Sequence, residues 1–262
     1  MSAPAETTKV KKRRWPYWLG AVVLALGAAY GVLVLVVRHP LPDGQEGPAA
    51  DAMARALEAR LGSEAWARTG AVRWTFRTRH QHLWDRARGF ARVRWREADV
   101  LLDLKTRTGR AFRNQRELEG ADRDALLAKA YAFWANDSFW LAAPFKLFDP
   151  GTRRALVTLS DGRRALKVSF GEGGVTPGDH YLWILGADER PTAWRMWVSV
   201  LPVAGLEAAI LEWKTLATGA QIAARHKLVG LLPVDLTDLA GAASLAELEP
   251  GADPFSLLSA QK

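Results

Sequence analysis

The sequence contains no cysteine in its 262 residues. This absence excludes disulfide bonds, thiol catalysis and thiolate metal ligands, and it also excludes attachment through a lipidated N-terminal cysteine. Methionine and tyrosine are scarce, with three and four copies, whereas tryptophan occurs twelve times. Because tryptophan is large and amphipathic, this count suits a core that keeps an open apolar face.

A strong excess of positive charge is also missing from most of the chain, although the net charge is +8. Six of the 36 basic residues lie at or before Arg38, and one of the 28 acidic residues, Glu6, lies there as well. The remaining 30 basic and 27 acidic residues nearly balance, so this part of the chain lacks the excess of positive charge that is typical of nucleic-acid-binding domains. The sequence therefore predicts no nucleic-acid partner.

Residues 17–37 form a run of 21 residues without a charged side chain. As a helix this run would span roughly 32 Å, which matches the hydrocarbon core of a bilayer. Five basic residues precede the run and only Arg38 follows it, which places the N-terminus in the cytoplasm. We therefore expect a basic cytoplasmic tail (1–14) and one transmembrane helix (15–38). The rest would be a periplasmic domain held at a bacterial inner membrane.

This segment has two further interpretations. A cleaved signal peptide is less favoured, because its apolar region is usually about 7–15 residues long and ends in small residues. Gly27 and Gly31 form one GxxxG spacing, which could bring two helices together as a weak homodimer. Glycine is common in membrane helices in any case, so ordinary composition is the preferred explanation of the spacing.

After the apolar run, the periodicity of the sequence changes twice. Residues 39–48 have the composition of a linker, and residues 49–61 have the apolar spacing of an amphipathic helix. From residue 71 the apolar period is two, which predicts short-connected antiparallel strands. These strands are expected over 71–77, 91–96, 100–105, 156–160, 165–170, 181–185, 194–200, 209–216 and 221–229, with another near Phe112. A second helix is expected over 122–135.

About ten strands and two helices predict an α+β fold. A sheet of this size curls or closes rather than staying flat. The second half of helix 122–135 is apolar nearly all round, so it requires burial on most sides. We therefore expect residues 49–239 to form a curved antiparallel sheet, an incomplete barrel wrapped around this helix, followed by a loose tail (240–262). Phe133 and Trp134 should be buried inside the curve.

The most distinctive segment is Asn136–Gly151, which is rich in aromatic residues and contains two prolines. Proline disfavours both helix interior and central strand, so we expect a fixed hydrophobic loop that covers one end of the sheet. Its pattern is similar to one in an uncharacterised bacterial envelope family with the fold of LolA and LolB, the periplasmic carriers of lipoproteins. The residues that carry this resemblance are Asn136, Asp137, Phe139, Trp140, Leu141, Pro144, Phe145, Lys146, Leu147, Asp149 and Gly151.

A second segment, Gly174–Asp179, also resembles that family, and the resemblance spans roughly residues 60 to 230. It implies a LolA/LolB-like half-barrel with a cavity that accommodates lipid, and it implies no particular activity. LolA is soluble and LolB is lipid-anchored, whereas a helical anchor is expected here. The difference favours handling of lipid close to the membrane over transport across the periplasm.

Eight apolar residues are the predicted lining of the cavity: Trp74, Phe76, Val93 and Trp95 from the strands, and Phe139, Trp140, Leu141 and Phe145 from the loop. The predicted partner is a lipid or an acylated protein, and no cofactor is expected. The alternative is an envelope scaffold or sensor domain of the same fold with a filled interior.

A few histidine and aspartate residues have the side chains that a metal or catalytic site needs. His80 and His82 would share one face of a strand and could bind a metal with Asp85, but no third ligand has a convincing spacing. No metal site is therefore predicted. Asp137 and Asp149 are interpreted as residues that cap turns rather than as catalytic carboxylates.

A hydrolase site could be imagined from Asp179 and His180 with Ser169 or Ser199. The Gly-x-Ser-x-Gly turn that exposes a nucleophilic serine is absent from the sequence, and nothing in the spacing brings these residues together. We therefore expect no catalytic residues and a protein that is not an enzyme.

Overall fold

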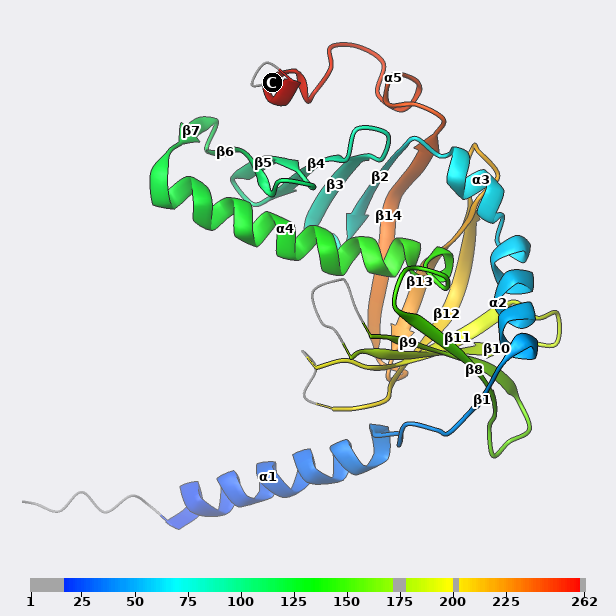
Figure 1. Cartoon of the computed structure of the whole chain (residues 1–262). Coiled ribbons are helices and arrows are strands. Elements are labelled where there is room, and N and C mark those ends of the chain that lie inside the picture. Colours follow the sequence, from blue (N-terminus) through cyan, green and yellow to red (C-terminus); the bar gives the residue numbers. More distant parts are fainter. Residues whose placement is uncertain (1–16, 172–177, 200–202, 260–262) are drawn as a thin grey trace, which may run out of the picture. The chain divides into compact units, whose positions relative to one another are not determined.

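The computed structural model describes residues 17–171, 178–199 and 203–259, which divide into two units between Arg38 and His39 (Figure 1). The first unit contains helix α1 (Tyr17–Val37). Among the described residues, no helix has both the length and the hydropathy needed to cross a membrane. The expectation of a transmembrane helix over 15–38 is therefore not supported. The predicted basic tail (1–14) lies outside the described residues.

The second unit is built on one sheet of fourteen antiparallel strands. The sheet runs in the order β1-β8-β9-β10-β11-β12-β13-β14-β2-β3-β4-β5-β6-β7, so β1 and β7 are its two edges and the sheet is open. The strands are β1 (Gln45–Glu46), β2 (Ala71–Phe76), β3 (His80–Asp85), β4 (Phe90–Trp95), β5 (Ala98–Asp103), β6 (Thr108–Arg113), β7 (Arg116–Leu118), β8 (Thr152–Thr158), β9 (Arg164–Phe170), β10 (His180–Leu185), β11 (Pro191–Trp197), β12 (Leu206–Thr215), β13 (Gln221–Leu228) and β14 (Leu232–Ala242).

The two halves of the sheet are joined by strands from opposite ends of the domain. Strand β14 pairs antiparallel with β2, with Leu236 opposite Phe76 and Ala242 opposite Ala71. All other neighbours in the sheet except β1 and β8 follow each other directly along the chain, as hairpins do. The predicted α+β class and the curved antiparallel sheet are therefore confirmed, with more strands than the periodicity indicated.

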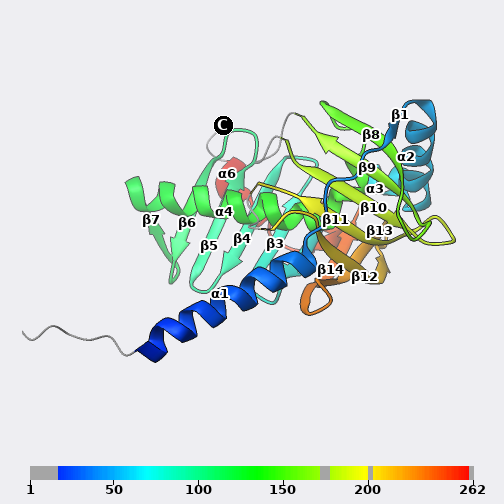
Figure 2. The same cartoon turned by 90° about the horizontal axis from the view of Figure 1, so that it is seen from below.

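Helix α4 (Gly120–Ala142) lies across one face of this sheet and packs against β4, β5, β6 and β13 (Figure 1, Figure 2). It is longer than expected, because Pro144 is the first residue after Gly120 that cannot continue a helix. The chain then makes a short 3-10 turn, η1 (Ala143–Phe145). The prediction of a loop from Asn136 onward was therefore wrong for residues 136–142, which are helical.

Two hydrophobic clusters form the core between α4 and the sheet. The first joins Val93, Trp95 and Val100 of the sheet to Leu126, Leu127 and Ala130 of α4. The second joins Trp74, Phe76, Ile222 and Leu236 of the sheet to Leu141 of α4. The strand residues in both clusters occur at every second position, which confirms the apolar alternation predicted from the sequence.

Within the segment expected to be a loose tail, residues 240–259 include regular elements that pack on the domain. Strand β14 continues to Ala242, and two short helices follow, α5 (Leu245–Leu248) and α6 (Ser256–Ser259). Phe255 and Leu258 are buried against Phe90 and Leu101, on the face of the sheet opposite α4. Because the segment consists mainly of small residues and prolines, its composition did not indicate that a few apolar side chains hold it against the sheet. Helices α2 (Pro48–Arg60) and α3 (Ser63–Arg68) complete the domain.

Candidate functional site

The eight predicted lining residues do lie on the face of the sheet that carries α4, or on α4 and η1 themselves. Five of them are buried in the two core clusters: Trp74, Phe76, Val93, Trp95 and Leu141. The other three, Phe139, Trp140 and Phe145, are half-buried. Packing against α4 therefore closes most of the surface that the sequence predicted to be a cavity wall.

Half-buried aromatic side chains lie on the C-terminal half of α4 and on η1. We call the following six residues the aromatic band: Tyr131, Phe133, Trp134, Phe139, Trp140 and Phe145. Each ring contacts another aromatic ring, as Trp134 does with Trp84 at a centroid distance of 5.3 Å and Phe139 with Tyr181 at 4.6 Å. Phe133 and Trp134 do pack against the sheet, as expected, but they are half-buried rather than fully buried, because the sheet is open.

The sheet side of the aromatic band is anchored by Trp194, which is fully buried. Its ring stacks on Trp183 at 5.0 Å and meets Trp140 edge to face at 4.8 Å. His226 lies against Trp140 at 5.2 Å, and one of its ring nitrogens, Nδ1, is 3.2 Å from the carbonyl oxygen of Val234. Burial lowers the pKa of His226 to about 4, so this imidazole is neutral at pH 7.

Two cavities occur on the opposite face of the sheet, away from α4. They measure about 760 and 460 Å³, and both are lined by Gln81, Arg92, Arg94 and Pro254. Arg92 forms an ion pair with Asp99, which lines the larger cavity. Charged and apolar side chains line both cavities, and Trp95 and Trp74 are the two predicted lining residues among them. The cavities lie on the face opposite α4, so they do not correspond to the apolar cavity that the sequence predicted between the sheet and residues 139–145.

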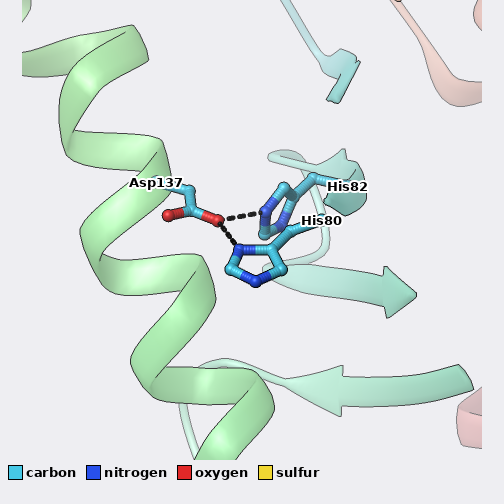
Figure 3. A group of neighbouring side chains, drawn as sticks. All are labelled: His80, His82 and Asp137. Atoms are coloured by element: carbon cyan, nitrogen blue, oxygen red, sulfur yellow. Dashed lines mark hydrogen bonds and ion pairs between the residues drawn. The ribbon is translucent and has the colours of Figure 1, made fainter. Parts of the chain in front are cut away.

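A compact polar group lies between β3 and α4 (Figure 3). His80 Nδ1 and His82 Nε2 are 2.7 Å and 2.8 Å from the same oxygen, Oδ2 of Asp137. The histidines are two positions apart on β3, so both point from the same face toward the helix. His82 and Asp137 are buried, and the side chain of His80 is 18% exposed.

Asp85, the third ligand considered from the sequence, does not join this group. It lies an odd number of positions from both histidines, so it points to the other face of the sheet. There it accepts a hydrogen bond of 2.6 Å from Nε of Arg88. Asp137 was missed because residues 136–142 were expected to form a loop. A signal was present, since Asn136, Asp137 and Ser138 interrupt an otherwise apolar stretch.

A separate neighbour fixes each member of the His80–His82–Asp137 cluster. Asn136 donates a hydrogen bond of 2.8 Å to Oδ1 of Asp137, which leaves Oδ2 directed at the histidines. The ring of Phe133 stacks on His80 at 3.9 Å, and the ring of Trp74 stacks on His82 at 4.5 Å. Because aromatic stacking restricts rotation of each imidazole, the three side chains are held in place before any ligand binds.

The protonation states of this cluster follow from its burial and its hydrogen bonds. Burial alone would raise the pKa of Asp137, but the bonds from His80 and His82 outweigh it and lower that pKa. Burial lowers the pKa of His82, against the opposing influence of Asp137. Asp137 is therefore an anion and His82 is neutral at pH 7, with Nε2–H as the donor. His82 Nδ1 is then a buried acceptor without a partner among the described residues.

The hydrolase set considered from the sequence does not assemble. His180 Nδ1 lies 2.7 Å from Oγ of Ser169, its cross-strand partner. Asp179 instead accepts hydrogen bonds from the hydroxyl of Tyr181 and the backbone N–H of Ser199, both at 3.3 Å. Adjacent positions of an extended chain point to opposite faces, which separates Asp179 from the His180 ring.

Asp149 lies in the turn after η1 and forms an ion pair with Lys146. Its backbone carbonyl also accepts a hydrogen bond from Thr152. These contacts fit the structural role in a turn that the sequence predicted for Asp149. Most of the second resemblance segment, Gly174–Asp179, lies outside the described residues.

In comparisons with known proteins, no family model matches this chain and no curated protein is significantly similar to it. The functional argument therefore rests on the aromatic band, on the His80–His82–Asp137 cluster and on the sequence itself.

Proposed function

We propose that the second unit, His39–Lys262, is a non-catalytic binding module of the bacterial cell envelope. Its ligand would be a lipid or the acyl group of a lipoprotein. The observation that carries the proposal is the aromatic band, whose six large apolar side chains stay half-buried along α4. Most of these side chains pack on the core clusters with one side and keep the other side partly accessible, where an apolar ligand could contact them. The resemblance of residues 136–151 to a LolA/LolB-like family supports the same class of ligand.

An acyl chain can gain enough binding energy from such a surface without a catalytic group. Each methylene taken from water contributes about 0.8 kcal/mol, so a dozen methylenes supply roughly 10 kcal/mol before ordering costs. The aromatic rings are rigid, so they lose little conformational entropy on contact with a ligand. The proposed ligand lies along the band rather than in an enclosed pocket, because packing against α4 fills the base of the sheet.

Replacing Trp140 with aspartate should weaken lipid binding strongly. An acyl chain that covered the new carboxylate would remove water from it, and this desolvation has a large free-energy cost. The measurement is saturable uptake of a fluorescent fatty acid by the purified full chain. Native mass spectrometry of the gently purified wild-type chain should also show copurified lipid. A matched control is Trp213→Asp, since Trp213 is half-buried on β12 and its ring faces Arg190 rather than the band.

Circular dichroism of each variant distinguishes lost binding from lost folding. If Trp140→Asp does not fold, Phe133→Asp tests the same band at its other end, where the side chain is also half-buried. Equal uptake by wild type, the Trp140 variant and the control would refute a ligand role for the band. The absence of both copurified lipid and saturable uptake would refute lipid binding itself.

A scaffold or sensor domain is the second candidate function. It is favoured by the burial of five of the eight predicted lining residues in the core clusters. In that case the aromatic band would contact a protein partner or remain as the partly covered side of the core. The lipid measurements above separate the two candidates, because a filled scaffold would show neither copurified lipid nor uptake.

The proposed envelope location rests on the sequence alone, on the uncharged run over 17–37 and the five cations before it. Alkaline phosphatase fused after Lys262 should be active, because this enzyme needs the oxidising periplasm to form its disulfides. A cytoplasmic reporter fused at the same position should be inactive. The reverse pattern, or a mature N-terminus near residue 40, would contradict membrane attachment with a periplasmic domain.

A further inference from the structure

We propose that His80, His82 and Asp137 bind one divalent first-row transition metal ion, such as Zn²⁺ or Fe²⁺, between β3 and α4. Each residue offers one ligand atom, and the three atoms all lie within 4.8 Å of one another (Figure 3). The proposal does not depend on lipid binding. It adds a metal centre to a domain for which the sequence indicated none.

The ligand set is selective for a class of ion. Two imidazole nitrogens and one carboxylate oxygen suit zinc, iron and their neighbours, whereas calcium and magnesium prefer oxygen ligands throughout. Three protein ligands also leave at least one coordination position for water or a bound molecule, as in catalytic zinc sites and in non-haem iron sites.

Two of the three distances between the ligand atoms are already close to those around a bound ion. An ion with bonds of about 2.0–2.2 Å holds neighbouring ligand atoms about 3 Å apart. Oδ2 of Asp137 is already 2.7 Å from His80 Nδ1 and 2.8 Å from His82 Nε2. These two distances need to lengthen by a few tenths of an ångström when the ion binds. The two imidazole nitrogens lie within 4.8 Å of each other, and they need to reach a similar spacing.

The surroundings of the ligands are those of a preorganised metal site. Asn136 holds the second carboxylate oxygen of Asp137, while Phe133 and Trp74 stack on the two imidazoles. Such supporting contacts orient ligands and restrict solvent at metal sites. A simple clamp between helix and sheet would need one hydrogen bond, whereas here two histidines converge on a single oxygen.

Metal binding is also consistent with the positions of the protons in the cluster. The hydrogen bonds to Asp137 place protons on His80 Nδ1 and His82 Nε2, the two nitrogens that would bind the ion. An imidazole that carries one proton can move it to its other ring nitrogen, which frees the ligand atom without a net change in charge. One carboxylate then faces the divalent ion, so the ion and its three protein ligands together have a net charge of +1.

The test uses the full chain, stripped with a chelator and titrated with Co²⁺ alone. One Co²⁺ should bind per chain, with d–d absorption bands that report nitrogen and oxygen ligands. Zn²⁺ should displace the Co²⁺ and should raise the midpoint of thermal unfolding, because an ion that binds only the folded state stabilises it. Mg²⁺ and Ca²⁺ at the same concentration should do neither.

The variants His80→Gln, His82→Gln and Asp137→Asn should each weaken Co²⁺ binding by more than about 10- to 100-fold, since the loss of a mere supporting contact already costs that much. Two matched controls should bind as wild type does. His226→Gln removes a buried histidine outside the cluster, and Asp85→Asn changes a carboxylate on the same strand that points to the other face.

The proposal is overturned if the folded wild-type chain binds no Co²⁺ and no Zn²⁺. It is also overturned if His80→Gln binds either ion as tightly as wild type does. His80 is the most exposed of the three ligands, so its variant can be tested even where the two buried substitutions prevent folding.

Discussion

Replacing Trp194 with alanine should lower the free energy of unfolding by about 3–5 kcal/mol. The side chain is 1% exposed and its ring contacts Trp183, Trp140 and Tyr181. The substitution therefore removes a large apolar surface and leaves a cavity between α4 and the second half of the sheet, which rigid neighbouring rings cannot fill. Urea denaturation followed by circular dichroism measures the change.

Trp134→Ala is the matched comparison, because Trp134 also packs against aromatic rings but is half-buried. Its loss of stability should be clearly smaller, since less apolar surface leaves water when it folds. A loss below about 1 kcal/mol for Trp194→Ala, or a larger loss for Trp134→Ala, would contradict the packing described for the aromatic band.

Acidification from pH 7 to pH 4 should destabilise the domain, and His226 should account for about 3 kcal/mol of that loss. The pKa of His226 is about 4 in the folded state, below its ordinary value of 6.5. Above pH 6.5 neither state binds the proton, and the contribution of the neutral side chain is fully present. As the pH falls below 6.5, the unfolded chain binds the proton first, so stability is lost until the folded pKa is reached.

Denaturation curves at a series of pH values between 7 and 4 measure this effect. His226→Gln should remove it, because glutamine does not titrate and can still donate to the carbonyl of Val234. His180→Gln is the comparison, since His180 is only half-buried and should contribute less. Equal losses of stability in wild type and in His226→Gln would show that His226 does not cause the acid sensitivity.

The periodicity of apolar residues predicted individual strands and the hairpins between strands that are neighbours in the sequence. The alternation in residues 71–76 and 90–95 gave strands β2 and β4, and Asp161-Gly162 marked the hairpin between β8 and β9. Strand β14 was missed because Pro233 and Gly241 break its strand character in isolation. Its place between β13 and β2 is fixed by long-range pairing, which sequence spacing does not encode.

The candidate metal cluster could likewise be predicted only where neighbouring residues in the sequence determine it. Period two correctly placed His80 and His82 on one face of a strand. Asp137 is 57 residues from His80, so bringing them together depends on the length and the rotation of α4. Pro144 ended the helix later than the aromatic composition suggested, and the carboxylate consequently faces the sheet instead of a turn. Asp85 was the wrong third ligand, because the alternation of side chains along a strand places it on the face opposite the two histidines.

The junction between β14 and β2 has a consequence for synthesis on the ribosome. Strands β2 to β7 are complete once residue 118 has emerged, but the partner of β2 lies at residues 232–242. For more than a hundred residues of translation, β2 is therefore an unpaired sheet edge, and such an edge can pair with another nascent chain. A stop codon before residue 232 would make that state permanent, so shortened products of this chain should aggregate rather than fold as half-domains.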